Sequence, residues 1–180
     1  MDTTRFKKIL VPVDFSSCSQ EAFHMAADLA FMFDARLLFL HVIDTRALEA
    51  LNHMGLASPS EEKTQKKKLR HFARLQARTL LQTPELKKLN IDRILSEGKP
   101  FVEIIRTART EKVDLIVMGS YGGQTSDVGR IFFGSTAEQV VRTANCPVLC
   151  VPFLYTKPTE PKNVSPQKPK AKRSRKAGSS

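Results

Sequence analysis

Residues 113–136, VDLIVMGSYGGQTSDVGRIFFGST, pass from an apolar run through a glycine-rich segment into the start of a helix. Five of the eight glycines of the chain lie between positions 119 and 134. The S-x-x-E spacing of Ser135 and Glu138 predicts a capping box with Ser135 as the N-cap of that helix. A strand that leads through such a loop to a helix N-terminus is a common phosphate site in α/β proteins, because unpaired amides there favour an anion.

Strands and helices alternate on both sides of this segment. A capping box formed by Ser17 and Gln20 opens the first predicted helix. Apolar runs predict strands at residues 8–13, 36–43, 90–96, 115–118 and 147–151. Amphipathic stretches predict helices at 19–33, 60–81, 100–112 and 136–143, and residues 44–60 read as a loop with at most a short helical piece. This alternation predicts an α/β fold, a doubly wound five-stranded parallel sheet with helices on both faces.

Length and charge divide the chain into two parts. We expect one domain over residues 1–153 and a disordered basic tail over 154–180, which is rich in Pro, Ser and Lys and poor in apolar residues. The tail contributes +7 of the net charge of +11. Two roles stay open for it: a solubilising tail, or a basic arm that contacts polyanions such as nucleic acid or acidic lipid heads.

The three cysteines are too few and too oddly numbered for a disulfide framework, which favours a reducing compartment. No apolar run approaches the roughly 20 residues of a membrane span, and Pro12 and Asp14 interrupt the apolar stretch near the N-terminus. We therefore expect a soluble cytoplasmic protein.

The glycine-rich segment fits neither of the best-known nucleotide templates. It lacks G-x-x-x-x-G-K-[ST], and no G-x-G-x-x-G follows the first predicted strand. Glycine clustering by itself is equally compatible with plain turns.

Four separated motifs carry a family resemblance: ILVPVDFS at 9–16, LLFLHVID at 37–44, DLIVMGS at 114–120 and GSTAEQVVRTANCPVLCVP at 134–152. Together they resemble a universal stress protein over roughly residues 5–153. The resemblance implies the strand order 3-2-1-4-5 and a homodimer, often formed through the last strand. Many members of that family bind ATP or a related adenine nucleotide, and others do not.

The nucleotide-binding members of the family carry G-x2-G-x9-G-[ST]. The resemblance assigns Gly119, Gly122, Gly134 and Ser135 to the phosphates, with Thr136 beside them. Eleven residues instead of nine separate the second and third glycines here, so the loop is two residues longer. A flexible loop tolerates insertion, because doubling its length costs only about 0.6 kcal/mol in closure entropy.

The resemblance also assigns residues to the adenine and ribose. Pro12, Val13 and Asp14 end the first strand beside them, and the backbone of Val42 meets the adenine. Asp14 would accept hydrogen bonds from hydroxyls or the base, or help to hold a divalent ion. Its alternative role is to end the strand and support the next helix start, and Val42 is equally compatible with an ordinary core position. His41, within an apolar strand, is expected to be a packed core residue rather than a ligand.

These observations predict a cytoplasmic, dimeric stress-response protein that binds ATP, with Mg²⁺ as a possible companion, as a regulatory ligand. We expect no enzyme, because neither a catalytic lysine nor a convincing carboxylate pair is present. The alternative is an interaction module of the same fold that binds no nucleotide and acts through its dimer surface and basic tail.

Overall fold

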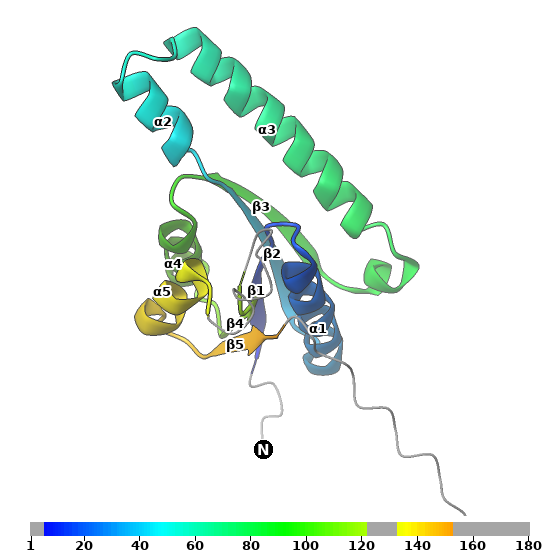
Figure 1. Ribbon diagram of the computed structural model, residues 1–180. Coiled ribbons are helices and arrows are strands. Elements are labelled where there is room, and N and C mark those ends of the chain that lie inside the picture. Colours follow the sequence, from blue (N-terminus) through cyan, green and yellow to red (C-terminus); the bar gives the residue numbers. More distant parts are fainter. Residues whose placement is uncertain (1–5, 122–132, 153–180) are drawn as a thin grey trace, which may run out of the picture.

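The computed structural model describes residues 6–121 and 133–152, and in it a twisted sheet lies between two layers of helices (Figure 1). The strands are β1 (Lys8–Pro12), β2 (Arg36–Ile43), β3 (Ile91–Glu97), β4 (Leu115–Gly119) and β5 (Val148–Val151). The helices are α1 (Ser17–Phe33), α2 (Arg46–His53), α3 (Pro59–Leu80), α4 (Pro100–Thr110) and α5 (Ser135–Thr143), with a 3₁₀ helix η1 (Pro84–Lys88) before β3.

The five strands form one parallel sheet in the order β3-β2-β1-β4-β5. Both the predicted fold class and the predicted strand order are confirmed. The chain builds β1, β2 and β3 outward in one direction and then returns to place β4 on the other side of β1. The strand order therefore reverses between β1 and β4, where open α/β sheets generally bind their ligands.

Alternate residues of the strands point to opposite faces and build two cores. On one face Val11 and Phe39 pack with Phe23 of α1 and with the inner side of α3. On the other face Leu10 and Ile116 pack with α4 and α5. Figure 1 shows the same division, with α1 and α3 on one side of the sheet and α4 and α5 on the other. Because β1 and β4 are buried on both faces, their runs are apolar throughout.

Two helix starts differ from expectation. The N-cap of α1 is Ser16, whose side chain accepts a hydrogen bond from the amide of Ser19, so the predicted box of Ser17 and Gln20 is wrong by one residue. The short helical piece that we allowed in the loop before the long helix is present as α2. A capping box of Ser58 and Glu61 then opens α3. Several residues here can cap, and local spacing alone did not identify the correct one.

No helix among residues 6–121 and 133–152 is long and apolar enough to cross a membrane. The predicted basic tail lies outside the described residues, so its disorder and its contact with polyanions stay predictions.

Candidate functional site

A cavity of about 480 Å³ opens at the carboxyl ends of β1 and β4, where the strand order reverses. This volume lies within the range of small-molecule sites. Eight of the nine residues predicted to contact a nucleotide line this one cavity: Pro12, Val13, Asp14, Val42, Gly119, Gly134, Ser135 and Thr136. The ninth, Gly122, lies outside the described residues. Positions far apart in the sequence thus meet at one place.

The end of β1 is held by its neighbours. The main-chain amide of Val13 donates to Leu40, and Nδ1 of His41 lies 2.7 Å from the Val13 carbonyl oxygen. A carbonyl only accepts, so Nδ1 carries the proton and donates. His41 is thus a positioning residue beneath the cavity, more specific in role than the packed core residue we expected.

Burial lowers the pKa of His41 below its ordinary value of 6.5, and this effect exceeds the rise caused by the bond to Val13 and by the charge of Asp14. The imidazole is therefore neutral at pH 7. Its ring also packs at a tilt against Phe15, with the ring centroids 4.6 Å apart, and Phe15 has a φ of +65°, which is unusual for a residue with a side chain. Such backbone strain is often found beside functional sites.

Asp14 has two roles available. One of its carboxylate oxygens accepts hydrogen bonds from the amide (3.0 Å) and the hydroxyl (2.5 Å) of Ser16, which supports the start of α1. The side chain as a whole is exposed at the cavity. Within the part of the chain that the structure describes, these turn bonds involve Oδ1 alone, which leaves Oδ2 for a ligand hydroxyl or a bound cation.

The start of α5 forms another part of the cavity wall. The N-cap is Gly134, and no side chain makes a capping bond there, so the predicted capping box of Ser135 and Glu138 is wrong. Because Gly134 already takes the N-cap position, Ser135 becomes the first helical residue. By contrast, α1 and α3 begin with serine caps. The amides of the first turn of α5 have no partner within the helix, and the positive end of the helix dipole adds to their attraction for anions.

The two ends of the glycine-rich segment are tied together. The amide of Gly134 donates to the carbonyl of Ser120, and the amide of Ser120 donates to Val151 of β5, both at 2.9 Å. These two amides are therefore engaged within the protein and are not donors for a ligand. Among the described residues, the main-chain donors that remain at this wall are the amides of Ser135, Thr136 and Ala137.

Gly119 lines the cavity and also lies close to α1. A Cβ at this position would lie 2.8 Å from Sγ of Cys18 and 3.1 Å from the Cys18 main chain. Its φ is not positive. The close packing of α1 against the end of β4 therefore accounts for a glycine at this position, and the contact of Gly119 with a phosphate stays a prediction.

Sequence reasoning missed a charged pair at the cavity. Asp44 follows β2, and Arg46 begins α2; the guanidinium Nε lies 2.8 Å and 3.0 Å from the two carboxylate oxygens of Asp44. The hydrogen bond from Arg46 lowers the pKa of Asp44. The signal was present, because charged residues directly after a parallel strand lie at the ligand-binding edge of the sheet.

The lining offers few groups for a metal ion. Within the described residues, no cluster of three or more His, Cys, Asp or Glu side chains is placed to hold one. Asp14 and Asp44 are the carboxylates that line the cavity, and Arg46 already neutralises the second. A cation here would need further ligands from a bound molecule.

This combination defines a class of protein: a doubly wound α/β domain with a cavity at the switch point of its sheet and an uncapped helix start in the cavity wall. A model of the universal stress protein family matches residues 5–152, and the chain belongs to that family. Its relatives include universal stress protein MJ0531 of Methanocaldococcus jannaschii, 33% identical over 146 residues, with 81% of this chain and 82% of the relative covered. Universal stress protein MJ0577 of the same organism is 32% identical over 155 residues, and the match covers 81% of this chain and 94% of the relative.

Solved structures agree with this assignment. A structure of protein MJ0577 superposes with a TM-score of 0.69 at 31% identity and covers 82% of this chain and 96% of its own. Two structures with a bound nucleotide share the fold. A universal stress protein in complex with cAMP superposes with a TM-score of 0.52 at 22% identity and covers 82% of this chain and 98% of its own. A universal stress protein from Archaeoglobus fulgidus in complex with dAMP superposes with a TM-score of 0.51 at 21% identity and covers 81% of this chain and 98% of its own.

Proposed function

We propose that this chain binds an adenine nucleotide, ATP, in the cavity between β1 and β4 and that the nucleotide acts as a regulatory ligand. The observation that carries the proposal is that eight of the residues assigned through the family resemblance, from separate parts of the sequence, line one cavity with an uncapped helix start in its wall. The cAMP and dAMP complexes of distant family members support it by showing that this fold accommodates adenine nucleotides.

The geometry favours a particular orientation of the ligand. The phosphates lie against the first turn of α5 and accept hydrogen bonds from the amides of residues 135–137 and from the hydroxyls of Ser135 and Thr136. The adenine and ribose lie beside Pro12, Val13 and Val42. Oδ2 of Asp14 is then available to a ribose hydroxyl.

Charge balance favours a metal ion with the nucleotide. The described lining contains two carboxylates and a single cation, Arg46, which is paired with Asp44. A triphosphate would meet little positive charge there apart from the helix dipole. We therefore propose that Mg²⁺ enters with ATP and takes most of its ligands from phosphate oxygens and water, as is usual for this ion.

Binding rather than turnover is the proposed role. Phosphoryl transfer needs a positioned base and strong neutralisation of the transferred group. Along the described lining no lysine is present, and the arginine is occupied by Asp44. These features support a ligand that is sensed and retained.

We also propose a homodimer formed through β5. This strand lies at the end of the sheet order, so one of its edges is not paired with another described strand. Its Leu149 is 39% exposed. An open edge with an exposed apolar side chain is suited to pairing with a second copy. The three cysteines are free, in keeping with a proposed site of action in the reducing cytoplasm.

Calorimetric and thermal titration of the full chain tests the nucleotide proposal. ATP with Mg²⁺ at 100 times its dissociation constant should stabilise the fold by about 2.7 kcal/mol, which raises the melting temperature by roughly 5–11 °C. GTP at the same concentration controls for non-specific effects of phosphate. An unchanged melting temperature at millimolar ATP would support the interaction module instead.

A further inference from the structure

A second hollow lies between the outer side of α1 and η1 and shares no lining residue with the cavity at the strand ends. Its volume is about 830 Å³. Its apolar part includes Met25, Leu86 and Leu89, together with Phe31 and Met32, which are 67% and 73% exposed. We call this hollow the α1–η1 groove. Large apolar side chains grouped at an exposed groove are characteristic of a surface that another segment covers.

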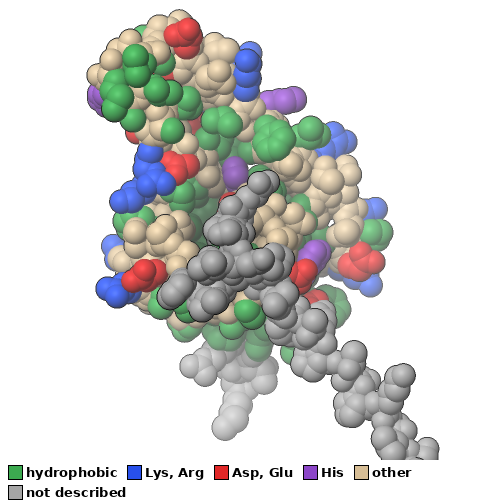
Figure 2. Space-filling model, viewed as in Figure 1, with side chains coloured by type: hydrophobic (Ala, Val, Ile, Leu, Met, Phe, Trp, Pro, Cys, Tyr) green, Lys and Arg blue, Asp and Glu red, His purple; other side chains and the backbone are tan. Residues whose placement is uncertain are grey.

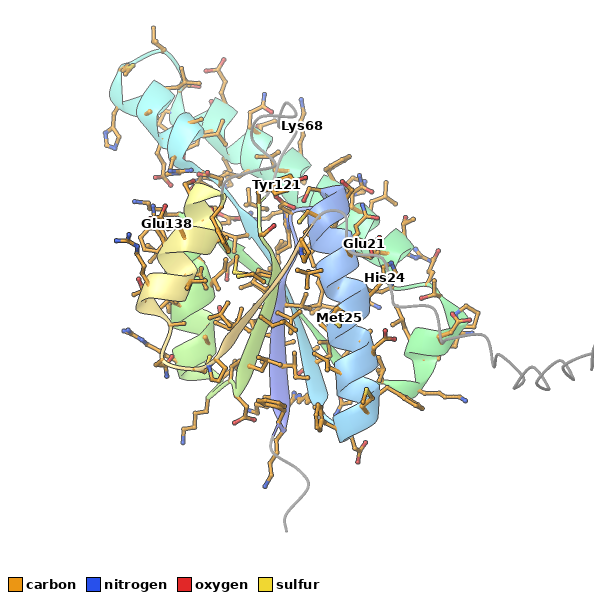
Figure 3. The ribbon with its side chains drawn as sticks, turned by 60° about the horizontal axis from the view of Figure 1, so that its bottom comes forward. Glu21, His24, Met25, Lys68, Tyr121 and Glu138 are labelled. Carbon is orange, nitrogen blue, oxygen red and sulfur yellow. The ribbon has the colours of Figure 1, made fainter. Side chains whose placement is uncertain are left out.

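The polar part of the α1–η1 groove is mainly acidic. Glu21, Asp28 and Glu85 line it, with Lys88 and His24 between them. This is unusual in a chain whose net charge is +11. Figure 2 shows red acidic atoms beside green hydrophobic ones on the flank over α1, and Figure 3 shows Glu21, His24 and Met25 along that helix. The groove therefore fits an occupant that combines apolar and basic side chains.

The residues that follow β5 leave the domain close to α1. Sγ of Cys18, in the first turn of α1, donates to the carbonyl of Val151 at 3.4 Å, so β5 ends beside the start of α1. Twenty-eight residues follow Pro152. From Cys18 to Met32 the helix advances about 21 Å at 1.5 Å per residue. An extended chain covers that distance in about seven residues.

The composition of this C-terminal segment matches the α1–η1 groove. It begins with three apolar residues, Phe153, Leu154 and Tyr155, and then carries eight Lys or Arg against a single acid. Pro158 and Pro161 favour an extended backbone in the residues around them. Apolar residues thus come first, where the chain leaves the domain and Met25 is within reach, and basic residues follow.

We propose that the C-terminal segment from residue 153 onward docks in the α1–η1 groove of its own chain. Residues 153–155 cover the apolar side chains near Met25, and the basic residues pair with Glu21 and Glu85. A second copy of the chain is the competing occupant. The groove lies outside the nucleotide cavity, so the docking can hold or fail independently of the proposed function.

Methionine oxidation of the full chain tests the docking with an internal control. Met32 in the groove and Met54 after α2 are 73% and 71% exposed, so peroxide should oxidise both at similar rates if nothing covers either. A segment that occupies the groove about nine-tenths of the time slows oxidation of Met32 about tenfold relative to Met54. Mass spectrometry of peptides from the oxidised protein measures both rates.

Variants of the full chain identify the occupant. Replacing the eight Lys and Arg of the C-terminal segment with Ser, or combining Glu21→Lys with Glu85→Lys, should remove the protection of Met32. Glu111→Lys, a charge reversal outside the groove, should leave it intact. Equal oxidation rates of Met32 and Met54 in the unaltered chain at low salt would overturn the proposal. Protection that survives in the serine variant would overturn it in favour of a second copy.

Discussion

Replacing Gly119 with Ala tests whether the end of β4 is shaped by packing against α1. The new Cβ would lie 2.8 Å from Sγ of Cys18 and 3.1 Å from its main-chain carbon and oxygen. The Sγ is itself held by Val151, so relief of the clash requires a movement of the first turn of α1. Overpacking of this kind typically costs about 1–3 kcal/mol.

A loss of about 2 kcal/mol lowers the melting temperature of a domain of about 150 residues by roughly 4–8 °C. Differential scanning calorimetry and urea unfolding without nucleotide measure this effect. Adding Cys18→Ala removes the sulfur contact but not the main-chain contact, so Gly119→Ala should cost less in that background. Gly55→Ala is the matched control. It has open space around its Cβ position and φ of +70°, so backbone strain of about 1–2 kcal/mol is its main cost.

An unchanged melting temperature for Gly119→Ala would refute the packing argument. An equal loss with and without Cys18 would show that the sulfur contact contributes nothing.

Three further predictions concern the cavity and the sheet edge. Burial lowers the pKa of His41 below 6.5, so the contribution of neutral His41 to stability is fully present above that pH. The free energy of unfolding should therefore fall as the pH drops from about 6.5 toward the lowered pKa. Urea unfolding at a series of pH values should show a smaller fall for His41→Gln. Leu149→Lys on β5 should shift the protein toward monomer in sedimentation experiments. Leu69→Lys on α3 is the control, because Leu69 is equally exposed at 39%, and it should leave the dimer intact. Loss of the dimer in both variants, or in neither, would contradict pairing through β5. Asp14→Asn keeps an oxygen acceptor for Ser16, so it should leave the melting temperature nearly unchanged while weakening ATP binding. Asp14→Ala should lower both the melting temperature and the ATP affinity. Unaltered ATP affinity in both variants would show that Asp14 does not contact the nucleotide.

Much of this architecture could be predicted because it depends on patterns that each segment carries by itself. The apolar runs of β1, β2 and β4 are continuous because both faces of those strands are buried, and their alternation with amphipathic stretches led to the parallel-sheet prediction. The convergence on one cavity follows from the sheet order, which carries the carboxyl ends of β1 and β4 to the same edge.

The errors arose where the outcome depends on neighbours in space. Ser135 is spaced correctly for a capping box, but Gly134 is the N-cap and its amide is fixed by Ser120. The close approach of Gly119 to Cys18, a residue about 100 positions away, was also not visible from the glycine spacing. The pairing of Asp44 with Arg46 depends on where α2 begins, and that helix was expected to be mostly loop.

The role of main-chain amides at the start of α5 can be tested with two substitutions at one position. Ser135 is the first helical residue, and Gly134 before it has φ −65° and ψ 146°, a conformation compatible with a following proline. Ser135→Pro therefore removes one amide donor while the helix is retained, and Ser135→Ala removes only the hydroxyl. Circular dichroism and melting temperature confirm that both variants fold.

The most direct measurement is the ATP affinity of the unaltered chain and of these two variants by titration calorimetry. We predict that ATP binds the unaltered chain, that Ser135→Ala weakens binding by about 1 kcal/mol, and that Ser135→Pro weakens it by a further 1.5–3 kcal/mol or so, the usual contribution of a hydrogen bond to a charged group. Equal affinities for the alanine and proline variants, or no binding by the unaltered chain, would contradict a phosphate held by the amides of α5.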